Sequence, residues 1–308
     1  MKKLWAVLAW SGSLALAPAA GAAPVETVIK VPGFADFLAV DGDTVWTTNK
    51  GRVERWSKAG KLAEVPLAGA CGAMTISAGA LWVADCKAMT VNRIDIRANR
   101  VAAVIPTGLA SPDGEMNVVS GAGSIWVASD KSGVIARIDP ATNTVIGSIK
   151  VEPGTSYLAF GEGALWAVSA PAQTVQKIDP GKNTAVATTR LGKAPGFLAA
   201  GEGAVWVQEQ GDGAVARIDP ATGAVTGRVK VDATLKWGDI DTGGGKVWLR
   251  TTAGQTFVVL DPKSLAILAR VGAPVGSGAL RYTPDGIWTS AHDVHTLSWW
   301  ADPAAIGN

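Results

Sequence analysis

Histidine and cysteine are scarce in this chain, which contains two of each among its 308 residues. The cysteines are Cys71 and Cys86, and two thiolates alone do not complete the four-ligand shell of a structural zinc ion. Both histidines, His292 and His295, lie in the single stretch SAHDVH. Any histidine chemistry is therefore confined to that stretch.

An excess of charge of one sign is missing as well. The chain has 28 basic and 26 acidic residues, and removal of Lys2 and Lys3 with the leader described below leaves 28 − 2 = 26 basic residues. The mature chain would then be neutral overall. A nucleic-acid-binding surface needs clustered, excess lysine and arginine. We therefore expect no nucleic acid among the partners.

The N-terminus lacks a hydrophobic run long enough to cross a membrane. An apolar run extends from Leu4 to about Ala17, and a tail of small residues ends at Ala22. A spanning helix needs roughly 20 apolar residues, whereas this layout is that of a secretory signal peptide. We expect residues 1–22 to be removed. The mature protein, residues 23–308, would be exported to the periplasm or the medium, with no membrane span.

The two cysteines have the setting of a disulfide, which persists in exported proteins. They flank two short apolar runs joined by a tight turn at residues 77–80. If the runs pair as antiparallel strands, residues whose numbers sum to 157 face each other, and Cys71 then lies opposite Cys86. Opposed strand residues have Cα atoms about 4.5 to 5.5 Å apart, which a disulfide bridges. We predict a structural disulfide, with a redox-active pair as the alternative.

The chain is rich in glycine and tryptophan, with 37 and 13 residues, and it repeats itself. The unit GAGSIWVASDKSGVIARIDPATNTVIGSIKV at residues 121–151 returns from Gly161 and from Gly201, and weaker copies occur elsewhere. Seven tryptophans occupy the same place in successive units, at intervals of 36 to 44 residues: Trp46, Trp82, Trp126, Trp166, Trp206, Trp248 and Trp288. Each unit has four short strand-like runs separated by turn signals. Four strands in about 41 residues are typical of a propeller blade.

We therefore predict an all-β fold, a seven-bladed β-propeller with four-stranded blades. The last unit supplies only three strand-like runs, and the missing run is found near the N-terminus in ETVIKV, residues 26–31. Pairing of this segment with the last blade would close the ring and cover two sheet edges that would otherwise template aggregation.

Several repeated residues have structural explanations. The tryptophans are expected to pack between blades. The aspartates of the D-P turns are expected to accept hydrogen bonds from nearby backbone N–H groups. The basic residues two positions before them, such as Arg137 and Lys177, are expected to face outward.

Residues that depart from the repeat in the loops of one face are better candidates for function, because packing does not require them. That face collects the loop after each tryptophan strand and the loop that leads into each blade. The candidates are Asn49, Lys50, Asp113, Glu115, Asn117, Asp130, Tyr157, Glu209, Trp237, Asp239, Arg250, His292, Asp293 and His295. Cys71 and Cys86 fall on the same face, where a disulfide would brace its rim.

The segment IDPATNTVIGSIKV resembles the repeat of YVTN-type propellers, and GAGSIWV followed by VIARID is similar to the streptogramin B (virginiamycin B) lyase-like group. The lyase resemblance implies a magnesium-dependent elimination that opens a cyclic depsipeptide at its ester, with a glutamate and two histidines near the channel mouth. On that hypothesis His292, His295 and Glu209 are the catalytic candidates.

Three functional hypotheses remain open. The leading one is an exported, non-catalytic propeller that binds a small molecule, a peptide or an envelope protein on the loop face, acts as a monomer and needs no cofactor. The second is a metal-assisted lyase or hydrolase, in which magnesium would be the cofactor. The third is a structural member of an envelope complex.

Overall fold

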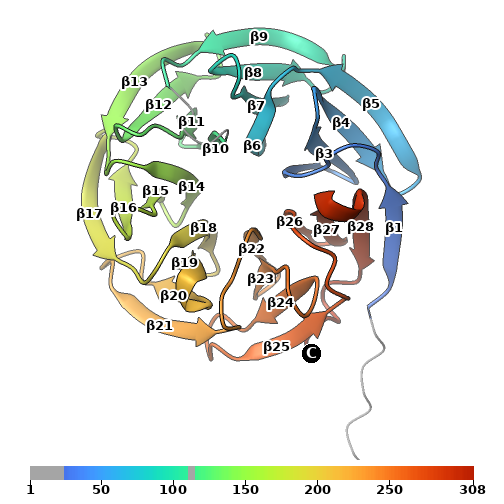
Figure 1. The fold of residues 1–308 in the computed structure, drawn as a ribbon. Helices are drawn as coiled ribbons and strands as arrows, with labels where there is room; N and C mark the ends of the chain where they lie inside the picture. The colour runs from blue at the N-terminus through green and yellow to red at the C-terminus, as the bar shows by residue number, and fades with distance from the viewer. Residues whose placement is uncertain (1–23, 110–114) are drawn as a thin grey trace, which may run out of the picture.

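A computed structural model describes residues 24–109 and 115–308 as a ring of seven four-stranded antiparallel sheets (Figure 1). The predicted signal peptide and Asp113 lie outside the described residues. The seven-bladed propeller expected from the repeat is confirmed. In the part of the chain described, no helix is long and apolar enough to cross a membrane.

The strands of each blade run from the central channel outward. The first four blades contain β2 (Leu38–Asp41), β3 (Thr44–Asn49), β4 (Arg52–Ser57) and β5 (Gly60–Pro66); β6 (Ala70–Ser77), β7 (Ala80–Asp85), β8 (Thr90–Asp95) and β9 (Arg100–Pro106); β10 (Asn117–Gly121), β11 (Ser124–Ala128), β12 (Val134–Asp139) and β13 (Thr144–Lys150); and β14 (Thr155–Gly161), β15 (Ala164–Ser169), β16 (Thr174–Asp179) and β17 (Thr184–Arg190).

The last three blades follow the same order, and two of them carry a one-turn 3-10 helix after the second strand. They contain β18 (Pro195–Gly201), β19 (Ala204–Glu209), η1 (Gln210–Asp212), β20 (Ala214–Ile218) and β21 (Val225–Lys230); β22 (Ile240–Gly243), β23 (Lys246–Arg250), β24 (Phe257–Leu260) and β25 (Ile267–Val271); and β26 (Leu280–Thr283), β27 (Gly286–Ala291), η2 (His292–Val294), β28 (Thr296–Ala301) and β1 (Glu26–Lys30).

The N-terminal strand closes the ring, as the sequence predicts. β1 pairs antiparallel with β28, from Glu26 opposite Trp300 to Lys30 opposite Thr296. In Figure 1 the blue N-terminal strand lies beside the red C-terminal strand. The last blade is therefore built from both ends of the described chain, and the edge of β28 is covered.

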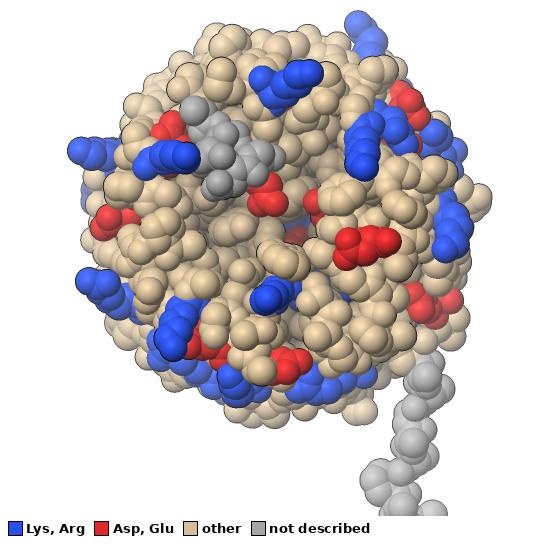
Figure 2. Space-filling model, in the orientation of Figure 1, with Lys and Arg blue, Asp and Glu red and all other residues tan. Residues whose placement is uncertain are grey.

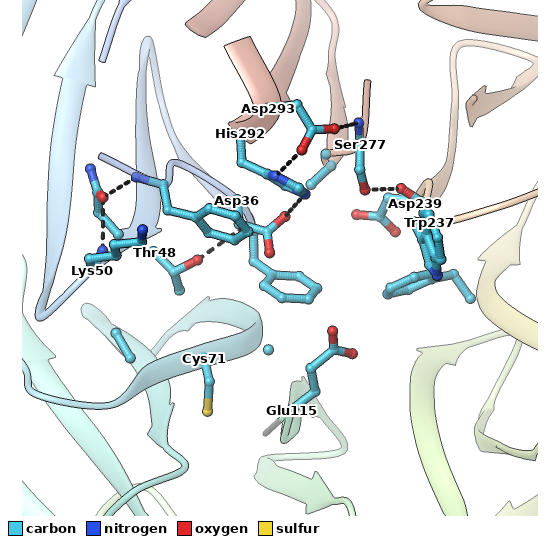
Figure 3. Close-up of a pocket in the computed structure, with 18 of the residues that line it drawn as sticks. Asp36, Thr48, Lys50, Cys71, Glu115, Trp237, Asp239, Ser277, His292 and Asp293 are labelled. Carbon is cyan, nitrogen blue, oxygen red and sulfur yellow. Dashed lines mark hydrogen bonds and ion pairs between the residues drawn. The ribbon is translucent and has the colours of Figure 1, made fainter. Parts of the chain in front are cut away.

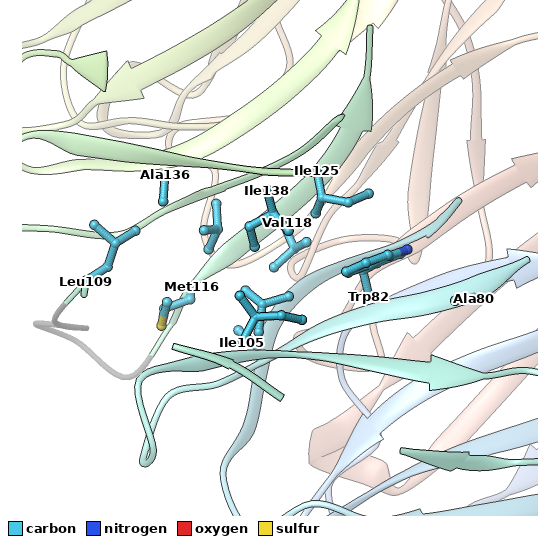
Figure 4. Close-up of a cluster of buried hydrophobic side chains, with 12 residues drawn as sticks. Ala80, Trp82, Ile105, Leu109, Met116, Val118, Ile125, Ala136 and Ile138 are labelled. Atoms are coloured by element: carbon cyan, nitrogen blue, oxygen red, sulfur yellow. The ribbon is translucent and has the colours of Figure 1, made fainter. Parts of the chain in front are cut away.

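The repeated tryptophans fill the spaces between blades, as expected. All seven are fully buried. Around Trp82, side chains of the second and third blades interdigitate, among them Ile105, Met116, Val118 and Ile138 (Figure 4). Burial of each large apolar side chain contributes roughly 1.5 to 3 kcal/mol, so these contacts hold neighbouring blades together.

The basic residue of the third strand does not face outward as predicted. Arg137 lies directly opposite Trp126 on the adjacent strand, and its guanidinium sits 4.7 Å from the centre of the indole ring. It also donates to Pro180 O and Asn183 Oδ1 of the next blade, at 2.9 and 2.7 Å. Lys177 repeats the arrangement with Trp166 and Pro220 O. The flanking Ala136 and Ile138 pack against the preceding blade, while Arg137 reaches the following blade.

The turn aspartates behave as expected. Asp219 Oδ1 accepts hydrogen bonds from the backbone N–H groups of Ala221 and Thr222, both at 2.8 Å. These bonds favour the ionised carboxylate and lower the pKa of Asp219. The aspartate is therefore part of the turn that joins the two outer strands of the blade.

The Cys71–Cys86 disulfide is present, with Cα atoms 6.0 Å apart, but the predicted register is wrong. A bulge between Cys71 and Thr75 shifts the pairing, so that Cys71 lies opposite Ala84. Gly72, in the bulge, has a φ of +65°, and a Cβ there would lie 2.1 Å from Met116 O of the next blade. Close contact with that blade thus bends β6, and the disulfide joins β6 to the loop after β7.

Candidate functional site

The loops that lead into the innermost strands meet the loops that follow the second strands at one mouth of the channel. They enclose a pocket of about 520 Å³. Figure 2 shows this face with a hollow at its centre and acidic side chains at the edge of the hollow. The functional face predicted from the repeat is therefore the face that carries the pocket.

The described lining of the pocket is acidic. Four carboxylates line it: Asp36, Glu115, Asp239 and Asp293. Lys50 is the basic residue among the described lining, and its ammonium lies at the rim, 5.7 Å from the centre of the Phe34 ring. The pocket is thus more negative than the nearly neutral chain as a whole.

Aromatic rings form much of the remaining wall. They are Phe34, Phe37, Tyr157, Phe197 and Trp237. Phe197 joins two of these rings, with its centre 4.4 Å from that of Tyr157 and 6.3 Å from that of Phe37. The pocket therefore offers apolar faces beside carboxylates, a combination that suits a ligand with both apolar and charged parts.

His292 lies between two aspartates (Figure 3), and its ring also contacts a phenylalanine. Its Nδ1 lies 3.0 Å from Asp293 Oδ1, and its Nε2 lies 4.0 Å from Asp36 Oδ1. The imidazole stacks on Phe34 with ring centres 4.0 Å apart. Asp293 is fixed in turn, because its Oδ2 accepts the backbone N–H of Ser277 at 2.7 Å. The imidazole is thus oriented toward the pocket.

Burial and neighbouring charges shift the acidity of this pair. Burial first, and then the nearby carboxylates Glu115, Asp239 and Asp293, raise the pKa of Asp36 to about 7 against an opposing effect of Arg250. Burial lowers the pKa of His292, although Asp293 acts in the opposite direction. Near neutral pH, Asp36 is therefore poised between its two forms and the imidazole is mainly neutral.

Arg250, predicted from the sequence to bind a ligand, lies beneath the pocket and is not among the residues that line it. Its side chain is 1% exposed, and its guanidinium donates to the backbone carbonyls of Ser290, Thr251, Thr256 and Gly276. Burial lowers the pKa of Arg250 to about 10, while Asp293 and Asp36 favour its charged form. This arginine fixes the loops that carry the pocket.

A second cavity, of about 270 Å³, continues into the channel between the innermost strands. It shares Tyr157, Phe197 and Asp239 with the first. The carboxylate of Asp239 forms an ion pair with Arg281, which lines the channel cavity. Asp239 therefore stands where the two cavities join.

The structure brings together eight of the residues predicted from sequence. These line the pocket: Asn49, Lys50, Glu115, Tyr157, Trp237, Asp239, His292 and Asp293. Asn117 is buried and lines the channel cavity, where its Oδ1 accepts the backbone N–H of Leu158. Asp130 lies outside both cavities and accepts the N–H of Ser132.

Two of the three catalytic candidates lie outside the pocket. Glu209 is 0% exposed, accepts two hydrogen bonds from Arg228 at 2.7 and 3.0 Å, and accepts the N–H of Gly192. His295 is exposed, has a φ of +57° and ends η2 by donating its backbone N–H to His292 O. The turn of η2 thus separates the two histidines, and no Glu–His–His group forms among these three described residues.

Sequence reasoning missed Asp36, Phe34, Phe37, Phe197 and Ser277, all of which line the pocket. A usable signal existed for Asp36 and Phe37. They immediately precede β2, in the same kind of loop as Glu115 and Asp239, which precede β10 and β22. The segment PGFADF, residues 32–37, lies between the ring-closing strand and β2, so it holds the same position as the other loops that lead into blades.

The described residues do not form the ligand set that magnesium or zinc would need. Among them, no group of three or more histidine, cysteine, aspartate or glutamate side chains is placed to hold a metal ion. Asp293 and Asp36 flank His292 on opposite nitrogens, so these three side chains do not converge on one point. The described lining therefore does not supply the ligand set for the metal that the lyase resemblance implies.

No family model matches the chain, and no curated protein matches it. Solved structures do. Virginiamycin B lyase from Staphylococcus aureus is 18% identical with a TM-score of 0.77, over 91% of this chain and 99% of the lyase. A streptogramin B lyase structure is 15% identical with a TM-score of 0.74, over 90% of this chain and 96% of the other. Hydrazine synthase of Kuenenia stuttgartiensis is 14% identical, again with a TM-score of 0.74, over 89% and 97%. Likeness at this level of identity establishes the fold that these proteins share.

Proposed function

We propose that this protein is an exported binding protein that holds a small molecule or a peptide side chain in the pocket at the channel mouth. The observation that carries the proposal is the pocket itself, with carboxylates and aromatic rings from several blades around about 520 Å³. Ligand sites in proteins are concave, largely apolar and supplied with a few convergent polar groups. Export is supported by the leader-like N-terminus and by the disulfide.

A thermal-shift screen against cyclic peptides, glycans, amines and metal ions tests this function. A ligand at 100 times its dissociation constant stabilises the folded state by about 2.7 kcal/mol. The shift should shrink in Trp237→Ala and Glu115→Gln, which alter the pocket, and persist in Asp43→Asn. Asp43 is an exposed carboxylate in the turn at the opposite end of the β2–β3 hairpin. A screen without hits, or hits that the pocket variants leave unchanged, would overturn the proposal.

A second candidate is a lyase or hydrolase, which the arrangement of Asp293, His292 and Asp36 favours. An imidazole oriented by one carboxylate and kept neutral by burial can accept a proton from a substrate in the pocket. The fold is shared with virginiamycin B lyase, of which a catalytically inactive form has been solved with quinupristin. If this second function is correct, His292 is the base that accepts the proton of the substrate. Asp36, which lies beside the imidazole, then exchanges that proton with it.

Incubation of the protein with quinupristin, followed by mass spectrometry, tests the second candidate. Linearised product should form with the wild-type protein and should fall at least about a hundredfold in His292→Asn, as expected for loss of a general base. His295→Asn is the matched control, because His295 lies outside the pocket. Intact quinupristin after prolonged incubation would contradict this activity and leave the binding function standing.

A further inference from the structure

We propose that the ligand of this pocket carries a positively charged amine next to an apolar or aromatic group. The amine would lie among the carboxylates of Asp36, Glu115 and Asp293, and the apolar part would lie against the rings of Phe34 and Trp237. This inference rests on the proposed function, because it names the ligand class of the same pocket.

The balance of charge around the cavity favours a cation. Four carboxylates line it against one described lysine, Lys50 at the rim, and two nearby arginines are engaged elsewhere. Arg250 donates to backbone carbonyls below the pocket, and Arg281 pairs with Asp239 from the channel side. An anionic ligand would meet like charges with no described arginine in the lining to receive it. An amine would neutralise the carboxylates that now face one another.

The aromatic wall supplies a second kind of attraction. A cation within about 6 Å of the centre of an aromatic ring is stabilised by the negative face of the ring. At this rim the chain already makes two such contacts: the ammonium of Lys50 lies 5.7 Å from the centre of the Phe34 ring, and that of Lys236 lies 5.5 Å from the centre of the Trp237 ring. Lys50 also lines the pocket. An ammonium of the protein itself therefore makes, at the rim, the cation–ring contact that we assign to the ligand.

Trp237 lies exposed at the rim of the pocket, in a backbone conformation that is unfavourable for a bulky residue. Its side chain is 66% exposed, and its φ of +48° is in the left-handed region, which bulky residues rarely adopt. Ser277 Oγ donates to Trp237 O, and Gly238 forms an isolated bridge with Gly278, so the loop is held in this form. Strained backbone of this kind concentrates at ligand clamps. An exposed indole held beside a pocket is suited to cover a bound cation.

Cation binding should be linked to a proton. The groups that face Asp36 are the carboxylates Glu115, Asp239 and Asp293, the guanidinium of Arg250 and the imidazole of His292. An amine placed among them favours ionised Asp36 and lowers its pKa from about 7. Binding near pH 7 then releases a proton. Affinity should rise between about pH 6 and pH 8, because Asp36 no longer needs to lose its proton and His292 stays neutral.

Isothermal titration calorimetry with three probes of similar size tests the ligand class. The probes are benzyltrimethylammonium, which is a cation, benzyl alcohol, which is neutral, and benzoate, which is an anion. We expect the cation to bind at least about tenfold more tightly than benzyl alcohol, and benzoate not to bind. Titration in buffers of different ionisation enthalpy should show proton release at about pH 7.

Charge variants supply the matched controls. Asp36→Asn should weaken binding of the cation about tenfold and abolish proton release, while Lys50→Met should strengthen binding. Asp43→Asn and Lys263→Met change exposed charges in turns at the other ends of the strands and should leave affinity unchanged. Far-ultraviolet circular dichroism confirms that each variant is folded.

The outcomes separate this inference from the proposed function. If benzyl alcohol or benzoate binds as well as the cation and Trp237→Ala weakens it, the pocket binds ligands but not this class. If the cation binds equally well to wild-type protein and to Asp36→Asn, the inference is wrong. If none of the three probes binds, the inference also fails, and the broader screen then decides the proposed function.

Discussion

At the scale of single residues, the informative side chains are those that the blade repeat does not require. Asp36 and His292 occupy loop positions, and no repeated contact needs a carboxylate or an imidazole there. Both have acidities shifted by their surroundings. Shifted pKa values in a cavity are typical of sites that bind or react, because burial and like charges are unfavourable for stability.

Asp36 makes a first prediction, about the pH dependence of stability. Because its pKa is raised from 3.8 to about 7, the folded state binds this proton more tightly than the unfolded state. Its contribution is fully present below pH 3.8 and is lost as the pH rises to about 7. Asp36→Asn should therefore be more stable than the wild type at about pH 8, by on the order of 2 kcal/mol, and similar to it at about pH 4.

Urea denaturation of both proteins at about pH 4 and about pH 8 measures this difference. Asp43→Asn, which alters an exposed carboxylate, should follow the wild type at both values. If Asp36→Asn and the wild type are equally stable at the higher pH, ionisation of Asp36 does not destabilise the folded state, and the prediction is wrong.

Glu209 makes a second prediction, that its role is structural. Its buried carboxylate is held by Arg228 and by the backbone N–H of Gly192. Glu209→Gln should lower the free energy of unfolding by about 1 to 3 kcal/mol, since hydrogen bonds to a charged group are lost. Affinity for any pocket ligand should be unchanged. If the Glu209→Gln variant has normal stability but loses binding or activity, Glu209 has a functional role and the prediction is wrong.

At the scale of elements, the sequence predicted strands more reliably than the details of their pairing. The repeated tryptophans located the second strand of every blade, because one buried ring per blade is a direct packing requirement. The pairing of β6 with β7 was predicted wrongly at Cys71. The bulge lies where Gly72 comes close to Met116 of another blade, and spacing within a hairpin carries no information about that approach.

The site was predictable in its location and only partly in its members. Loops that depart from a repeat identify a face, so Glu115, Trp237, Asp239 and His292 were found. Which side chains converge depends on the angles between blades. Glu209 lies outside the pocket, and its partner Arg228, 19 residues away, gave no recognisable pattern in the sequence.

The disulfide makes a third prediction, at the level of this hairpin. It joins cysteines 15 residues apart, on β6 and on the segment after β7. Replacing both Cys71 and Cys86 with alanine should reduce the free energy of unfolding by roughly 3 kcal/mol, as expected from loop entropy. Chemical denaturation of the double variant measures the loss, and the reduced wild type should match it. A loss below about 0.5 kcal/mol would mean that the bond does not constrain the unfolded chain.

At the scale of the whole molecule, closure of the ring makes a fourth prediction. β1 covers β28, and its removal would leave a long, exposed strand edge in the last blade. A chain that starts after Lys30 should have a lower melting temperature and should form larger species in size-exclusion chromatography. Lys30→Glu, which keeps the strand and changes one exposed side chain, is the control. A truncated protein that melts like the wild type and elutes unchanged would contradict this view of closure.

Closure also bears on the pocket, because the last blade contributes His292 and Asp293 while the adjoining first blade contributes Asp36. Val31 donates its backbone N–H to His295 O, and Ser290 Oγ donates to Asp36 O across the same junction. The site is thus assembled where the two ends of the ring meet, and the same contacts that seal the propeller position its most perturbed groups.

A crystal structure of the protein with the strongest hit from the thermal-shift screen would show whether the pocket at the channel mouth holds a ligand. Electron density for that compound should lie between Asp36, Glu115 and Trp237, with a cationic group facing the carboxylates. Density for the compound elsewhere on the propeller, with this pocket filled only by water, would contradict this expectation.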